Sequence, residues 1–321
     1  MSGYRVAVTD DRFGSYREEE AELAGVGARL EVWNLKTEEE AEEALKHADG
    51  ILVNLFPLTA RVITTLPKCR VICRYGVGVD NVDVEAATRK GIWVTRVPDY
   101  CVEEVSDHAL ALLLGCARKL AYKDRKIREG LWNLHGNQPC HRIAGGTLGI
   151  VGFGRIGRRL CGKVAGLGLA RVLVCDPYVD ASIVEAAGGV RVDLDTLARE
   201  SDFISLHVPL TVETRGMIGE RELAMMKRTA ILVNTARGQV LDERAAAVAL
   251  KEGRIAGAGL DVFESEPLPA ASPLRECDTV IMSDHAAWYS EESVVELKVK
   301  AGRNIAAVLA GGRPLDPVNS I

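Results

Sequence analysis

The segment 152–157, Gly-Phe-Gly-Arg-Ile-Gly, constrains the fold of this chain more than any other segment. The apolar run Thr147–Val151 precedes it and a helical pattern follows it, which is the context in which three glycines at this spacing hold a dinucleotide. Gly152 would make the tight turn, Gly154 would let the backbone approach a pyrophosphate, and Gly157 would allow the helix to pack closely on the strand. The segment therefore predicts a Rossmann-type α/β domain, with the pyrophosphate at the helix N-terminus.

An acidic residue stands where such a domain needs one. Asp176 follows the strand-like run 171–175 and lies 19 residues beyond Gly157. A carboxylate there can accept hydrogen bonds from the adenosine ribose hydroxyls and would repel a 2′-phosphate. Pro177 and Tyr178 come next, so no arginine is adjacent to receive that phosphate. We therefore expect NAD as the cofactor rather than NADP.

Strand-like and helical segments alternate along both halves of the chain, which predicts an α/β fold with two doubly wound parallel sheets. The expected strands are 5–9, 29–33, 51–55, 71–74 and 92–95 in the first half, and 147–151, 171–175, 203–207, 230–234, 257–261 and 279–282 in the second. The expected helices between and after them are 16–24, 37–47, 155–167, 193–200, 220–227, 242–252 and 291–309.

Two helical stretches suggest where the domains divide. The apolar-periodic stretch 102–129 is too long for a surface connector, and we expect one helix that crosses from one domain to the other. No strand follows the last helical pattern, so its simplest destination is back on the first domain. These features predict a discontinuous domain of residues 1–99 and 289–321, and a cofactor domain of residues 100–288. A polar loop is expected over 132–146.

Charge and composition argue against several classes of function. The chain has 321 residues, a net charge of −5 and a pI of about 5.8, which disfavours nucleic acid or an anionic membrane as the main partner. No apolar run approaches the ~18 residues that span a bilayer, and the N-terminus enters a strand pattern at once, so we expect no signal peptide. The eight scattered cysteines form no CxxC pair, which is typical of free thiols in the cytoplasm. We expect no metal site.

Three polar residues, Arg237, Glu266 and His285, each follow a strand of the predicted cofactor domain. The carboxyl ends of parallel strands are where ligands bind in this architecture. Reduction of a 2-oxo acid requires a hydride, a proton for the carbonyl oxygen and a cation for the carboxylate. Histidine can supply the proton near neutral pH, a carboxylate on its other ring nitrogen selects the tautomer, and the arginine fork matches a carboxylate. This set predicts hydride-transfer chemistry on a small 2-oxo acid.

Other residues of the same types compete for these roles. Glu264 is an alternative partner for His285, and His207 is an alternative catalytic histidine. Because His207 precedes Val208 and Pro209 at the end of a strand pattern, a contact with the cofactor explains it better. The remaining histidines, for which structural or solvated roles are expected, are His47, His108, His135 and His141.

A second glycine pair, Gly76 and Gly78, does not predict another dinucleotide site. The third glycine is missing because position 81 is Asn81, and Asp80 and Asp83 would repel phosphate. We interpret this segment as a tight loop whose amides point into an interdomain cleft.

Several segments together are similar to those of the D-isomer-specific 2-hydroxyacid dehydrogenases. They are VGFGRIG, CDPY, LVNTARG, ALKEGRIAGAGLDVFESEP and DHAAWYS, and the similarity runs from RYGVGVDNVD at position 74 to about residue 300. Within the family, Arg74, DPY, ESEP and HAAWYSE most resemble the branch of the C-terminal-binding-protein corepressors. The phosphoglycerate and glycerate dehydrogenases are close relatives of that branch.

The resemblance implies an NAD-dependent homodimeric enzyme that interconverts a small 2-oxo acid and its D-2-hydroxy acid. It also implies a flavodoxin-like substrate domain built from both chain ends and a Rossmann cofactor domain, with a cleft between them. Arg237 would bind the substrate carboxylate and carbonyl, and Glu266 would pair with His285, the acid/base. Further substrate contacts are expected from Arg74, Val77, Gly78 and Trp288. The expected cofactor contacts are Gly152, Gly154, Arg155, Ile156, Gly157, Asp176, His207, Val208, Pro209, Thr235, Ala236, Asp261 and His285.

Two alternatives stay open at this point. Trp288, three residues after His285, would either line the pocket for the C3 substituent of the substrate or plug the second hinge. The corepressor resemblance also allows an NADH-responsive scaffold with weak turnover. Val77 stands where those proteins carry Ser. Formate dehydrogenases of the superfamily carry Gln at the position of Glu266, so formate oxidation is disfavoured.

Overall fold

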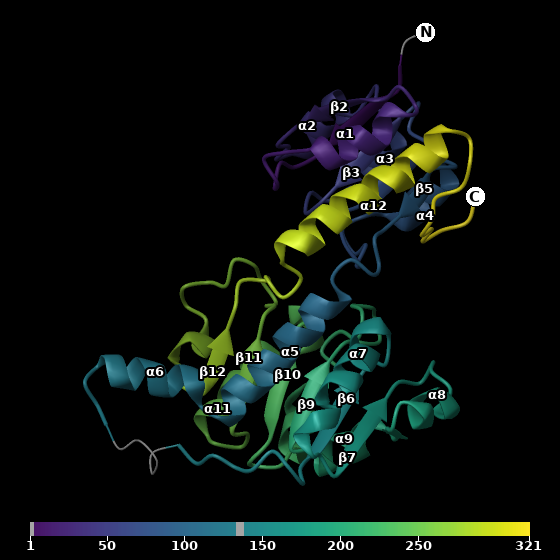
Figure 1. Cartoon of the computed structure of the whole chain (residues 1–321). Helices are drawn as coiled ribbons and strands as arrows, with labels where there is room; N and C mark the ends of the chain where they lie inside the picture. Colours follow the sequence, from purple (N-terminus) through teal and green to yellow (C-terminus); the bar gives the residue numbers. More distant parts are fainter. Residues whose placement is uncertain (1–2, 133–137) are drawn as a thin grey trace. The chain divides into compact units, whose positions relative to one another are not determined.

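The computed structural model describes residues 3–132 and 138–321, and these divide into two compact units (Figure 1). One unit combines Met1–Cys101 with Ser290–Ile321, and the other is Val102–Tyr289. The predicted loop over 132–146 lies partly outside the described residues, and His135 lies wholly outside them. Each unit is built on its own parallel sheet.

The sheet of the first unit has five parallel strands in the order β2-β1-β3-β4-β5, the flavodoxin-like order. The strands are short and rich in β-branched residues, and the residues of β3 are all buried. They are β1 (Arg5–Val8), β2 (Arg29–Val32), β3 (Gly50–Val53), β4 (Val71–Arg74) and β5 (Trp93–Thr95).

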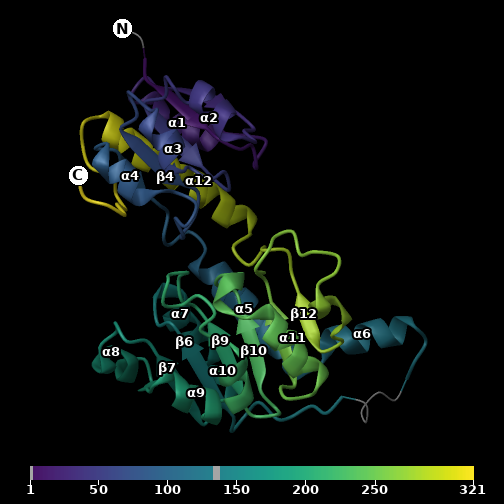
Figure 2. The same cartoon turned by 180° about the vertical axis from the view of Figure 1, so that it is seen from behind.

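Helices cover this sheet. Helix α12 (Glu291–Leu309) packs along α1 (Arg17–Ala24) and against β3 and β4, so the C-terminal segment completes the unit that the N-terminal segment begins (Figure 1). Helix α3 (Ala60–Thr64) packs against both α2 (Glu38–Ala44) and α4 (Val84–Arg89) (Figure 2). Thr37 caps α2 by accepting a hydrogen bond from the Glu40 amide, as its capping-box sequence predicts.

The second unit has a seven-stranded parallel sheet in the order β12-β11-β10-β9-β6-β7-β8. Counted from β6 within the unit, this is the Rossmann order, in which the strand sequence reverses direction between β6 and β9. The strands are β6 (Thr147–Val151), β7 (Arg171–Cys175), β8 (Val190–Arg191), β9 (Phe203–Leu206), β10 (Ile231–Asn234), β11 (Gly257–Leu260) and β12 (Val280–Met282). Two parallel-sheet α/β units confirm the predicted fold class.

Helices lie on both faces of this sheet. On the face seen in Figure 1, α5 (Val102–Ala117) packs against α7 (Arg155–Lys163) and over β10 and β11. On the face seen in Figure 2 lie α10 (Glu220–Met225) and α11 (Glu243–Lys251). The other helices are α6 (Leu120–Arg128), α8 (Ala181–Ala186) and α9 (Leu194–Glu200), with 3-10 turns η2 (Val164–Leu167), η3 (Gly238–Val240) and η4 (Pro273–Glu276). No helix among the described residues is long and apolar enough to cross a membrane.

The prediction of one helix over 102–129 that crosses between domains is wrong. Helix α5 lies wholly in the second unit, and the helical path breaks at Lys119, which adopts a left-handed conformation with φ 55°. The Lys119 side chain is buried and its ammonium donates a hydrogen bond of 2.6 Å to the carbonyl of Ala256. Lys119 thus breaks the helix and contacts a residue 137 positions away along the chain, and the hydrophobic periodicity of 102–129 reveals neither feature. The short elements β8, α3, α4 and α8 were also not predicted.

Candidate active site

The glycine turn joins β6 to α7, and its geometry explains two of its three glycines from the protein alone. Gly152 has φ 92°, and a Cβ there would lie 2.8 Å from the backbone of His207 and Val208. A Cβ on Gly157 would lie 2.3 Å from the carbonyl oxygen of Gly152. A Cβ on Gly154, in contrast, would meet no protein atom within 4 Å. The open side of Gly154, beside the exposed Arg155 at the start of α7, fits a dinucleotide phosphate approaching the backbone.

Asp176 follows β7 directly and its carboxylate is held by two backbone amides. Oδ2 accepts a hydrogen bond of 2.8 Å from Phe153, inside the glycine turn, and Oδ1 accepts one of 2.9 Å from Tyr178. These bonds fix the acid beside the turn, where it fits the ribose of a bound dinucleotide. The pairing of β7 with β8 also brings Arg191 close, and its guanidinium donates 3.2 Å to the carbonyl of Pro177. Sequence reasoning missed this arginine because only strand pairing places it near Asp176.

Other predicted cofactor residues follow neighbouring strands at the same edge. His207, Val208 and Pro209 come directly after β9, and Thr235 and Ala236 after β10. Burial lowers the pKa of His207 to about 4, and its Nε2 lies 2.9 Å from the Ser205 hydroxyl, so the ring is neutral at neutral pH. The hydroxyl of Thr235 is buried and has no hydrogen-bond partner within the part of the chain that the structure describes. An orphaned hydroxyl at this edge is a fitting donor or acceptor for a dinucleotide.

The turn after β10 presents Arg237. The buried side chain of Asn234 shapes this turn by accepting a hydrogen bond from the Ala236 amide and donating one to the carbonyl of Arg237. The next residue, Gly238, packs so tightly that a Cβ would lie 1.8 Å from the backbone carbon of Phe263. Only glycine allows this approach, which brings the arginine turn against the loop that carries Glu264 and Glu266.

Glu266 pairs with His285. The Nδ1 atom of His285 lies 2.7 Å from Oε2 of Glu266, and Oε1 of Glu266 accepts a hydrogen bond of 3.0 Å from the Phe263 amide. Burial raises the pKa of Glu266, but the hydrogen bonds from His285 and Phe263 and the positive charges of His285 and Arg237 outweigh it, so the pKa lies below its ordinary value. The three residues that the sequence singled out therefore share one electrostatic site.

The competing acid, Glu264, faces elsewhere. Its carboxylate accepts a hydrogen bond of 3.1 Å from the amide of Glu243 at the start of α11. Its own amide donates to the carboxylate of Glu243. Glu264 and Glu243 therefore join two segments of backbone and leave the histidine to Glu266.

Asp261 organises the loop that carries His285. Its side chain is buried, with 1% of its surface exposed, and its carboxylate accepts hydrogen bonds from the Ser283 hydroxyl (2.7 Å) and from the amides of Ala286 (2.9 Å) and Ala287 (3.0 Å). Ser283 in turn lies 2.8 Å from Nε2 of His108 on α5. The sequence did not point to Ser283 or His108 as parts of the site.

The residues predicted to contact the substrate lie in both units. Trp288 is partly buried and its ring packs edge-on against Tyr289, with 5.8 Å between centroids. Arg74, Val77 and Gly78 belong to the first unit, where Arg74 ends β4 and the other two follow in the next loop. Gly76 has φ 138°, a backbone conformation that residues with a side chain rarely adopt, so the loop depends on glycine at this position. The part of these residues in substrate binding stays a prediction.

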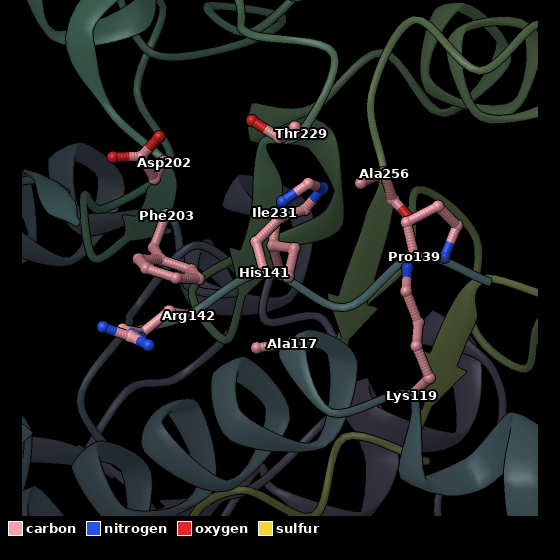
Figure 3. A pocket seen from close by; sticks show the side chains of 10 residues that line it. All are labelled: Ala117, Lys119, Pro139, His141, Arg142, Asp202, Phe203, Thr229, Ile231 and Ala256. Atoms are coloured by element: carbon pink, nitrogen blue, oxygen red, sulfur yellow. Dashed lines mark hydrogen bonds between the residues drawn. The ribbon is translucent and has the colours of Figure 1, made fainter. Parts of the chain in front are cut away.

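A separate pocket of about 50 Å³ lies at the opposite edge of the same sheet (Figure 3). Phe203 and Ile231, which line it, begin β9 and β10, and Ala256 directly precedes β11. Gly152, Arg237 and His285, in contrast, follow the carboxyl ends of strands. The pocket in Figure 3 is therefore not the site of the chemistry described above.

Known proteins resemble this chain in sequence and in structure. The glyoxylate reductase of Korarchaeum cryptofilum is 44% identical over 281 residues, which cover 86% of this chain and 84% of that protein. The crystal structure of a glyoxylate reductase from Paecilomyes thermophila superimposes with a TM-score of 0.89 at 30% identity, over 99% of both chains. The D-lactate dehydrogenase of Aquifex aeolicus, solved with NAD and lactic acid, superimposes with a TM-score of 0.86 at 30% identity, over 95% of this chain and 96% of that one.

Residues 110–287 match the family described as D-isomer specific 2-hydroxyacid dehydrogenase, NAD binding domain. This range contains the glycine turn, Asp176, Arg237, Glu266 and His285. The match confirms the predicted enzyme class and its NAD cofactor, and this chain belongs to the family of D-isomer-specific, NAD-dependent 2-hydroxyacid dehydrogenases.

Proposed function

We propose that this dehydrogenase reduces glyoxylate and other small 2-oxo acids to the corresponding 2-hydroxy acids, with His285 as the acid/base. The observation that carries the proposal is the bond between His285 and Glu266 beside Arg237, at the sheet edge that also holds the glycine turn. NADH, when bound, supplies the hydride. The residues of this chain supply the proton and the charges that hold and polarise the substrate.

Three side chains of this chain donate the proton, orient the histidine and bind the substrate. With Nδ1 bonded to Glu266, Nε2 is the ring nitrogen that can give a proton to the carbonyl oxygen as it becomes an alkoxide. The carboxylate of Glu266 accepts from Nδ1 and so selects the tautomer and orientation of the ring. Arg237 offers two parallel donors to the substrate carboxylate and polarises the carbonyl.

The substrate class is small and not phosphorylated. Relatives named glyoxylate reductase point to a substrate with little beyond the 2-oxo acid group. An indole at Trp288 would offer an apolar wall to any C3 substituent, and a phosphorylated chain would need extra lysine or arginine side chains.

The test is a panel of 2-oxo acids at saturating NADH, with the fall in NADH absorbance as the readout. Glyoxylate, pyruvate, hydroxypyruvate, a longer apolar 2-oxo acid and a phosphorylated one cover the alternatives. We expect kcat/KM to be highest for the small acids, and His285→Ala to abolish turnover while NADH fluorescence still reports binding. His141→Ala, at the opposite sheet edge, is the matched control and should behave as wild type.

The panel also separates the enzyme from the corepressor-like scaffold that the resemblance of ESEP and HAAWYSE suggests. A folded protein that binds NADH but turns over none of the acids would contradict the proposed enzyme and favour the scaffold. The relatives reported above carry the names of enzymes.

We further propose that the chain forms a homodimer through the outer surface of α6 and the residues after it. Four large apolar side chains are exposed there: Leu120 (58%), Ile127 (44%), Leu131 (48%) and Trp132 (77%). Several large exposed apolar side chains on one short segment are typical of a subunit interface. Light scattering should give a dimer mass for the wild type and a monomer mass for Ile127→Asp/Trp132→Asp. Val212→Asp, at an isolated exposed side chain (97%), should stay dimeric, and a monomeric wild type would contradict the proposal.

A further inference from the structure

We infer that His108 is a positioning residue for His285, acting through Ser283 and Asp261. The inference rests on the proposed role of His285 as the acid/base. His108 lies on α5, far from the catalytic residues in sequence, and it touches neither Glu266 nor Arg237 through any bond among the described residues. Its connection to the chemistry is a chain of hydrogen bonds.

The direction of each hydrogen in this chain follows from the groups involved. Nε2 of His108 lies 2.8 Å from Oγ of Ser283, and that Oγ lies 2.7 Å from Oδ1 of Asp261. A carboxylate only accepts, and a serine hydroxyl has a single hydrogen to donate. The hydroxyl hydrogen therefore goes to Asp261, and Ser283 accepts a hydrogen from Nε2 of His108. His108 is a donor here, and its Nε2 is not available to a substrate.

Asp261 also accepts hydrogen bonds from the backbone of the loop that carries His285. Its two carboxylate oxygens hold the amides of Ala286 and Ala287, directly after the catalytic histidine. Its carbonyl accepts a hydrogen bond of 2.8 Å from the amide of His285 itself. Residues on both sides of His285 are thus tied to one buried acid.

The loop needs such restraint because His285 adopts a left-handed backbone conformation, with φ 57°. This conformation is uncommon for a residue other than glycine and persists where the surroundings impose it. Without the donor on His108, the Ser283 hydroxyl could rotate away from Asp261 and leave Oδ1 one hydrogen bond short. Nε2 of His108 also lies 3.6 Å from Oδ1, so the two ends of this chain of hydrogen bonds are close to each other.

The expected consequence is a loss of turnover without a loss of substrate binding. His108→Leu fills the same space on α5 but removes the donor. At saturating NADH we expect kcat for glyoxylate to fall about tenfold, the effect of one net hydrogen bond on a rate, while KM changes less than about twofold. His108→Gln places an amide N–H near the position of Nε2 and should restore most of kcat. His141→Leu, at the opposite sheet edge, is the matched control for the loss of a partly exposed histidine.

A double-mutant cycle tests whether the effect travels through Ser283. If His108 and Ser283 act in one chain, adding His108→Leu to Ser283→Ala should lower kcat little further. Additive losses, no rescue by Gln, or a kcat of His108→Leu within about twofold of wild type would each overturn the inference. His285→Ala separates this outcome from failure of the proposed function. If that variant stays active, His285 is not the acid/base. If it is inactive while His108→Leu is normal, only the positioning role is refuted.

Discussion

Nδ1 of His285 lies 2.7 Å from Oε2 of Glu266, although the two residues stand on different loops, after β12 and β11. The same carboxylate is tied to the Phe263 amide on its own loop. This second bond orients Glu266 toward His285, whereas Glu264, two residues earlier, is turned to the start of α11. Substitution of Glu266 therefore tests the pair, and the same substitution at Glu264 is a control of identical chemistry.

Replacing Glu266 by Gln removes the charge of the carboxylate but keeps an oxygen that can accept from Nδ1. We expect kcat/KM for reduction to fall roughly 10²-fold, because the imidazolium loses its counter-charge. The measurement is kcat/KM for glyoxylate in Glu266→Gln and Glu264→Gln, and equal losses in both variants would refute the assignment.

Replacing Arg237 by Lys keeps the charge and removes the planar fork. We expect a loss on the order of 2–3 kcal/mol in transition-state stabilisation, the range for hydrogen bonds to charged groups. NADH affinity and Tm should barely change. Arg228→Lys, whose guanidinium donates a hydrogen bond to the carbonyl of Gly253, is the control. Near-normal kcat/KM in Arg237→Lys would remove Arg237 from the site.

Asp176 should make the enzyme prefer NADH to NADPH, since its carboxylate would repel a 2′-phosphate. The ratio of kcat/KM for the two cofactors measures this preference. Asp176→Ser should raise the relative activity with NADPH, because the carboxylate that repels the 2′-phosphate is removed while Arg191, which contacts Pro177, remains. Adding Arg191→Gln should cancel that gain. A wild-type preference for NADPH would show that Asp176 has another role.

Replacing Trp288 by Phe should change the ranking of 2-oxo acids while leaving glyoxylate reduction largely intact. A contact between the pocket and one methylene group of a substrate changes specificity by roughly 10- to 200-fold. This range is the upper limit for the change expected in Trp288→Phe. The measurement is kcat/KM for glyoxylate and for a longer apolar 2-oxo acid, with Trp33→Phe in the first unit as control. An equal fall for all substrates would mean that Trp288 is structural.

Glu19 should make the protein less stable as the pH rises. The residue is fully buried; burial raises its pKa, although the Tyr75 hydroxyl donates to it over 2.8 Å. A carboxyl with a folded pKa above its unfolded value favours folding most when protonated, and that contribution is lost as the pH rises through the folded pKa. We expect Glu19→Gln to have a higher Tm than wild type at pH 8, with the difference vanishing toward pH ~4.

Glu18 is the control, because its pKa is shifted in the opposite direction to that of Glu19. A hydrogen bond from Lys298 lowers the pKa of Glu18, so its contribution is present above the unfolded pKa and lost as the pH falls. Glu18→Gln should leave Tm unchanged or lower at pH 8. A lower Tm at pH 8 for Glu19→Gln as well would refute the sign assigned to Glu19.

The sequence by itself determined the features that depend on near neighbours. The apolar run of β6, the three glycines and Asp176 belong to one strand–turn–helix–strand unit, and the roles predicted for them follow from local backbone geometry. The alternation of strands and helices determined the fold class for the same reason. Placing Arg237, Glu266 and His285 after strands also brought them to one edge, because parallel strands all end on the same side.

Only the tertiary structure decided which of these residues meet. The choice of Glu266 over Glu264 depends on the bond to Phe263 and on the close packing of Gly238. The break at Lys119, the approach of Arg191 to Pro177 and the chain from His108 to Asp261 join residues up to 175 positions apart. Such contacts are set by strand register and helix packing, and these arise when the whole sheet assembles, so no short stretch of sequence encodes them.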